Sequence, residues 1–233
     1  GFAMLMALLA VVFLRMGFNG FSREALLARD VGLRNPWRRA TTALDASFRN
    51  RPPFLRLLWM RRWPIAIAAA GFPLGALAGY LAGTTSAIPA NVVKPVVTSL
   101  VRSTGGDGAV EEALAIFSHN VLAFLLVAGL AVLTAGLSGF LLTFAPGFIL
   151  GFVAALTSWS FALSGIVPNG FVEIPAAIIA GGLAIQIGAA AIHMDAAGGW
   201  TSRVLAAFAD YVRALRWLVP ALALASVLEV FLG

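Results

Sequence analysis

The sequence contains no cysteine and only two histidines, which excludes several kinds of site at the outset. Without cysteine the chain can form no disulfide bond, no thiolate metal site and no cysteine nucleophile. His119 and His193 lie far apart and match neither the HxxxH nor the HExxH spacing. We therefore expect neither a dedicated metal site nor a bound cofactor.

Charged residues are also scarce. They make up 11% of the chain, whereas 61% of the residues are hydrophobic and the mean hydropathy is +0.94. A typical soluble domain is about a quarter charged and about half apolar. One water-soluble core cannot bury so much apolar surface, so lipid must be part of the solvent. The composition predicts an all-α, polytopic transmembrane helix bundle.

Six stretches approach the length of about 20 apolar residues that a membrane span needs. They cover approximately residues 2–18, 64–83, 120–144, 146–167, 174–194 and 215–232, with a turn expected at 144–147. The first stretch has no basic n-region and no cleavage site, so a signal peptide is a poor fit. The predicted organisation is an N-terminal span (1–21), an arginine-rich cytoplasmic or interfacial elbow (22–63) and a five-span core (64–233) with an outer loop at 84–118.

Basic residues are concentrated near the start, since 11 of the 16 precede residue 63. An arginine-rich stretch can bind nucleic acid, but this one lies between two spans, where the positive-inside rule makes residues 22–63 cytoplasmic. Alternating spans then place the C-terminus outside the cell membrane. Aromatic side chains among the arginines suggest a helix in the headgroup plane, either a plain anchor or an elbow that docks a partner. The residues proposed to face the membrane or a partner are Arg49, Arg51, Arg56, Arg61, Arg62, Trp59 and Trp63.

Glycines recur every fourth residue along the second span, at Gly71, Gly75, Gly79 and Gly83. Small residues at this spacing let two helix backbones approach closely inside a membrane. The stripe therefore predicts a helix-packing face. Its partner is left open between another helix of this chain and a second copy of the chain.

Polar residues of three spans are expected to converge near the outer surface: His119, Asn120, Asn169, Glu173 and Glu229. The Pro168-Asn169-Gly170 sequence predicts a tight turn before the fifth span, with Pro175 in the first turn of the following helix. Ionisable groups beside a span are costly, and three interpretations follow: a structural hydrogen-bond cluster, a transporter's proton or ion site, or acid–base catalysis. Because no GxSxG, HExxH or paired-Asp motif is present, we expect the structural cluster and no enzyme.

Three segments resemble the stage II sporulation protein M family, a resemblance that extends over about residues 40–233. They are Ser118-His119-Asn120, the run from Gly165 to Gly182, and Ala225-Ser-Val-Leu-Glu229. The family's Pro-His-Gly-x-x-Glu-x-Pro-Ala motif is matched at Pro168, Gly170, Glu173, Pro175 and Ala176, but Asn169 stands where the family usually has histidine. The resemblance implies a multi-spanning, non-enzymatic membrane subunit or scaffold that works with membrane or cytoplasmic partners or as a homo-oligomer.

Residues 1–35 show a second resemblance, to the C-terminal end of an ABC-2 type permease. It is carried by the first span and the stretch Phe21-Ser22-Arg23-Glu24-Ala25-Leu26-Leu27. This resemblance implies an alternative function, a permease component of an ABC-type export system with an ATP-binding subunit. An ion-coupled transporter that uses Glu173 and Glu229 belongs to the same alternative.

Overall fold

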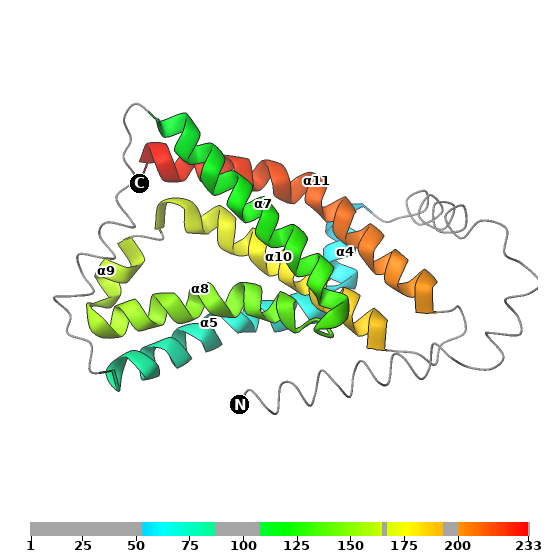
Figure 1. Ribbon diagram of the computed structural model, residues 1–233, viewed down its shortest axis with the longest axis horizontal. Coiled ribbons are helices and arrows are strands. Elements are labelled where there is room, and N and C mark those ends of the chain that lie inside the picture. The colour runs from blue at the N-terminus through cyan, green and yellow to red at the C-terminus, as the bar shows by residue number, and fades with distance from the viewer. Residues whose placement is uncertain (1–52, 87–107, 165–166, 193–199, 233) are drawn as a thin grey trace, which may run out of the picture. The chain divides into compact units, whose positions relative to one another are not determined.

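The computed structural model describes residues 53–86, 108–164, 167–192 and 200–232. The chain divides into two compact units, residues 1–49 and 50–233, and the described residues all belong to the second. These residues form seven α-helices and no β-strand (Figure 1): α4 (Phe54–Met60), α5 (Arg62–Thr84), α7 (Ala109–Leu133), α8 (Leu137–Leu156), α9 (Trp159–Ser164), α10 (Val167–Ile192) and α11 (Trp200–Leu232). The expected span at 2–18, Arg49 and Arg51 lie outside the described residues.

Five of these helices, α5, α7, α8, α10 and α11, are long and apolar enough to cross a membrane. The predicted all-helical membrane bundle is thus confirmed, although several helix boundaries differ from the prediction. Helix α7 begins at Ala109, so the end of the segment 84–118 is helical and continuous with the third span, as its sequence indicates. Helix α11 begins at Trp200 rather than near residue 215. Both helices begin before their most apolar stretch, because polar residues can also occupy the turns of a helix outside the membrane core.

The turn between the third and fourth spans was predicted at 144–147, and that prediction is wrong. The chain turns at residues 134–136, where Ala135 and Gly136 have φ values of 54° and 88°. The N–H of Gly136 bonds to the carbonyl of Ala131 at 2.8 Å, closing the end of α7. A residue with positive φ commonly ends a helix. Pro146, by contrast, lies inside α8. A membrane helix tolerates proline when neighbouring helices pack around it.

Helix α10 is at the centre of the bundle, with contacts to α5, α7, α8 and α11 (Figure 1). Half of its membrane-spanning stretch is buried, a larger share than in any other span. Its small and branched residues meet the aromatic and leucine side chains of α7 and α11 in the main apolar core. The residues of this core with 0% exposure are Ala131, Ala180, Leu183, Ala184, Ile187, Ala214 and Leu222.

The glycine stripe of α5 packs against α8 of the same chain, which answers the question left open by the sequence. All four glycines are buried. A Cβ atom on Gly75 or Gly79 would collide with the backbone of Phe144 or Phe148. The contact is reciprocal, because a Cβ atom on Gly151 of α8 would collide with the backbone of α5. Residue numbers rise together on the two helices, so α5 and α8 run parallel, as alternation of spans requires.

Candidate functional site

The polar residues predicted at the outer surface meet between α7 and α10. Asn120 Nδ2 donates a hydrogen bond to Glu173 Oε1 at 2.6 Å, across 53 residues of sequence. Asn120 lies 11 residues after the start of α7, and Glu173 lies six residues after the start of α10. The two helices therefore reach the same depth at these residues.

Two further members of the predicted group act on the same carboxyl. Glu229, near the end of α11, and His119, on α7, both lie near enough to Glu173 for an electrostatic influence on its carboxyl. Glu173 and Glu229 are partly buried, whereas His119 is exposed. We call Asn120, Glu173, Glu229 and His119 the carboxylate cluster; its residues come from three spans and lie at the end of the bundle where α10 begins.

The predicted Pro168-Asn169-Gly170 turn is not observed. Helix α10 begins at Val167, so these residues form its first turn, and Pro175 lies inside the helix rather than at its start. A proline in the first turn loses no hydrogen bond, because those N–H groups have no partner within the helix. Pro168 can therefore begin the helix as readily as end the preceding loop. The side chain of Asn169 lies outside the described ones, so its place in the cluster stays a prediction.

A second polar contact lies where α4, α5 and α11 meet, and sequence reasoning missed it. Arg61, the turn residue between α4 and α5, forms a salt bridge with Asp210 of α11, with Nη2 and Oδ2 2.9 Å apart. The Asp210 side chain is 1% exposed and that of Arg61 is 25% exposed. Arg61, predicted to face the membrane surface or a partner, is instead partly buried against this carboxylate. The feature of the sequence that could have indicated this contact is Asp210 itself, an acidic residue within an apolar helical stretch.

Hydroxyl groups make further bonds between the described helices. Tyr211 of α11 donates to the Phe124 carbonyl of α7 at 2.8 Å. Thr143 of α8 donates to the Ala68 carbonyl of α5 at 2.7 Å, and Ser138 of α8 donates to the α7 backbone. Such bonds fix the register of helices that pack in lipid without a hydrophobic driving force between them.

The other predicted surface residues in the described region are exposed. Trp59 and Trp63 are 70% and 72% exposed, and the Arg62 guanidinium lies 4.4 Å from the centre of the Trp59 ring. Arg56, on α4, is also exposed. Among the described residues, no group of three or more metal-ligating side chains occurs.

Chemically, the carboxylate cluster holds α7 to α10 through the hydrogen bond of Asn120 to Glu173. The salt bridge at the other end joins α5 to α11. The five candidate spans with these bonds between them define a multi-pass α-helical membrane protein.

Residues 64–233 match the model of the family described as Stage II sporulation protein M, which covers more than half of the chain. The chain therefore belongs to the Stage II sporulation protein M family. Searches of curated proteins and of solved structures found no match.

Proposed function

We propose that the chain is a non-enzymatic membrane subunit that acts as a scaffold within a complex of proteins. The observation that carries the proposal is the hydrogen bond between Asn120 and Glu173. It engages the carboxylate of Glu173 inside the protein and joins α7 to α10. This bond supports a stabilising role for Glu173 within the bundle.

Side-chain bonds that connect the other spans also support a scaffold function. Tyr211 and Asp210 connect α11 to α7 and to the start of α5, and Thr143 connects α8 to α5. A scaffold needs such a closed bundle, because its partners must meet a surface of constant shape.

Surfaces for partners are available on the outside of the bundle. Only 17% of the span in α7 and 22% of that in α5 are buried, against 50% in α10. These apolar outer faces suit lipid and partner subunits. In this proposal residues 22–63 are cytoplasmic and the C-terminus lies outside.

Ion-coupled transport, alone or as part of an export permease, is the second candidate, and the interaction between Glu173 and Glu229 favours it. Two carboxylates close together in or beside a span are a feature of proton and cation pathways. The experiment that separates the two candidates is Glu173→Gln, which removes the titrating group but retains an oxygen that can accept the Asn120 hydrogen bond. Glu173→Ala removes both and is the matched comparison.

The variants are reconstituted in proteoliposomes, where proton-coupled flux and the unfolding midpoint are measured, and copurifying proteins are identified. For a scaffold we expect no flux in any form, near-normal stability for Glu173→Gln and a lower midpoint for Glu173→Ala. We also expect partners to copurify without an ATP-binding subunit. A flux in the unmodified chain that Glu173→Gln abolishes while the fold stays intact would show the scaffold proposal to be wrong.

A further inference from the structure

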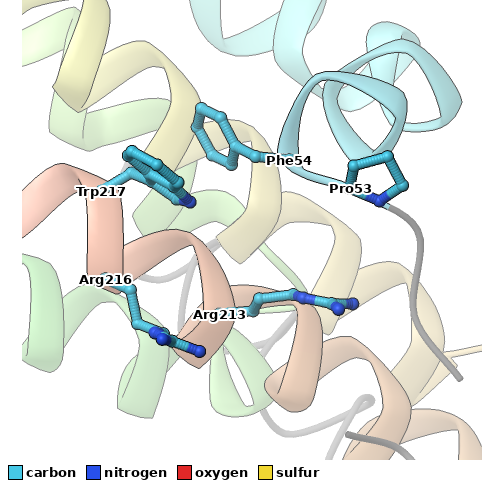
Figure 2. Close-up of a pocket in the computed structure, with 5 residues that line it drawn as sticks. All are labelled: Pro53, Phe54, Arg213, Arg216 and Trp217. Atoms are coloured by element: carbon cyan, nitrogen blue, oxygen red, sulfur yellow. The ribbon is translucent and has the colours of Figure 1, made fainter. Parts of the chain in front are cut away.

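One side of α4 packs against the bundle. Leu57 is 1% exposed, and the Phe54 ring stacks on the ring of Trp217 from α11, with the two centres 5.8 Å apart. Figure 2 shows this stack within the lining of a pocket, which consists of Pro53, Phe54, Arg213, Arg216 and Trp217. These contacts fix the rotation of α4 about its axis, so its opposite side faces outward.

The outward side of α4 and the first residues of α5 form a surface that combines large apolar side chains with arginines. In α4, Trp59 follows Leu55 by about one helical turn. Met60 follows Arg56 in the same way, so these four residues share one side of the helix. The apolar side chains of this surface are 54–77% exposed. We call it the Arg–Trp patch, and its members are Leu55, Arg56, Trp59, Met60, Arg62 and Trp63.

The Arg–Trp patch lies at the boundary of the membrane core. The membrane-spanning stretch of α5 begins at Arg62, and only the turn residue Arg61 separates it from α4. The 7 residues of α4 extend about 10 Å, so the whole helix is close to the start of the span. Tryptophan concentrates at this boundary, where its apolar ring and its N–H group are both accommodated. The patch is therefore at the depth of the lipid headgroups.

Two tryptophan rings hold the guanidinium group of Arg62. Its central carbon lies 4.4 Å from the centre of the Trp59 ring and 5.9 Å from that of the Trp63 ring. Both distances are within the range of a cation–π interaction. Such an interaction orders the side chain but by itself engages none of its N–H donors. Because Arg62 is also exposed, these donors are available to an anion.

The carboxylates that the structure describes do not neutralise the patch. At this end of the bundle the one described carboxylate is Asp210, which is 1% exposed and paired with Arg61, a residue outside the patch. The other described carboxylates belong to the opposite end of the bundle; they are Glu111, Glu112, Glu173 and Glu229. Among the described residues neither arginine of the patch has a salt-bridge partner. An anionic surface therefore complements its charge.

We propose that the Arg–Trp patch binds the surface of a bilayer that contains anionic phospholipid. Trp59 and Trp63 insert their rings among the headgroups, and Arg62, held by these rings, donates hydrogen bonds to a lipid phosphate. Arg56 adds to the positive charge of the same surface. Arginine forms short, charge-assisted hydrogen bonds to phosphate oxygens, and basic residues next to a span attract anionic lipids.

A bilayer fits this surface better than a partner protein does, because lipid already surrounds the span that begins at Arg62. It supplies anionic and apolar groups at the depth where the patch presents arginine and tryptophan. The lipid contact is separate from the proposed scaffold function and does not depend on it.

The test measures which lipids touch the patch in the full chain. The sequence contains no cysteine, so Met60→Cys provides one site for a fluorescent label within the patch. Leu126→Cys provides a matched site at an exposed position of α7. The labelled protein is reconstituted in phosphatidylcholine bilayers with brominated phosphatidylglycerol or brominated phosphatidylcholine, which quench the label on contact. At position 60 we expect a roughly fivefold preference for phosphatidylglycerol, from the contribution of one arginine near a membrane surface. At position 126 we expect no preference.

Arg62→Gln should reduce the preference at position 60 to roughly twofold or less, whereas Arg62→Lys, which keeps the charge, should retain most of it. Arg216→Gln is the matched control, because it removes an exposed arginine of α11 outside the patch. It should leave the preference at position 60 unchanged, since quenching reports only the lipids in contact with the label.

Equal quenching by the two lipids at position 60 would overturn the proposal, as would an equal loss of preference in Arg62→Gln and Arg216→Gln. A label at position 60 that neither lipid quenches would also overturn it, because protein or water rather than lipid would then cover the patch.

Discussion

Gly79→Ala tests whether the contact between α5 and α8 depends on the absence of side chains. A Cβ atom at this position would collide with the carbonyl oxygen of Phe148 and lie 2.8 Å from the carbonyl carbon. It would also lie 2.9 Å from the backbone nitrogen of Phe152. Backbone atoms cannot rotate away as a flexible side chain can, so the two helices must move apart.

Two opposing effects determine how much Gly79→Ala changes the free energy of unfolding. Overpacking a well-packed contact costs about 1–3 kcal/mol, and the upper part of this range applies because every blocking atom belongs to the backbone of α8. Alanine stabilises the helix by up to about 1 kcal/mol relative to glycine, through its higher helix propensity. We therefore expect Gly79→Ala to lower the free energy of unfolding by about 2 kcal/mol.

The assay is reversible unfolding in mixed micelles, followed by the helical circular dichroism signal as the denaturing detergent fraction rises. Gly129→Ala is the matched control, because Gly129 also lies within a spanning helix but a Cβ atom there would meet nothing within 4 Å. The control should be neutral or stabilised by up to about 1 kcal/mol. Equal stability of the two variants would refute the reasoning, since helix propensity alone would then govern both positions.

Three further variants test other parts of the bundle. Asp210→Asn leaves the Arg61 guanidinium without its counter-charge, and we expect a loss of about 2 kcal/mol in the same micelle titration. This is less than the 3–5 kcal/mol typical of fully buried pairs, because Arg61 remains 25% exposed; no change in stability would contradict this account. Gly136→Ala forces a side chain into a left-handed conformation and places its Cβ 2.9 Å from the Ile185 backbone, so the thermal unfolding midpoint should fall. Ala135→Gly should raise it, since glycine adopts the φ of 54° without strain.

The sequence predicted much of the fold because apolar length is a direct signal in a membrane protein. The predicted stretches at 64–83 and 215–232 lie within α5 and α11, and most of the one at 174–194 lies within α10. Those at 120–144 and 146–167 do not match single helices, because α8 (Leu137–Leu156) takes part of each. The boundary between α7 and α8 could not be found in this way, because residues 120–167 are apolar almost throughout. Pro146 was the more visible residue, but a proline within a packed membrane helix is tolerated. The positive φ values at Ala135 and Gly136 are visible only in the structure.

The candidate site was predicted in part. Alternating spans placed Asn120 and Glu173 at one depth, and in the structure the two side chains are bonded to each other. The salt bridge of Asp210 was missed because its partner, Arg61, lies 149 residues away and had been placed on the membrane surface. A charge within an apolar helix indicates that a partner exists, but it does not identify the partner.

By itself, the sequence determined the all-helical membrane class, the glycine face of α5 and the common depth of Asn120 and Glu173. These features depend on composition and helical periodicity, which act within each segment. The tertiary structure alone decided that α8 fills the glycine face, that α10 lies at the centre, that Asp210 pairs with Arg61 and that Arg213 and Arg216 border a pocket. The physical reason is that these features depend on which helices meet and at what rotation, and that choice is made by packing of the whole bundle.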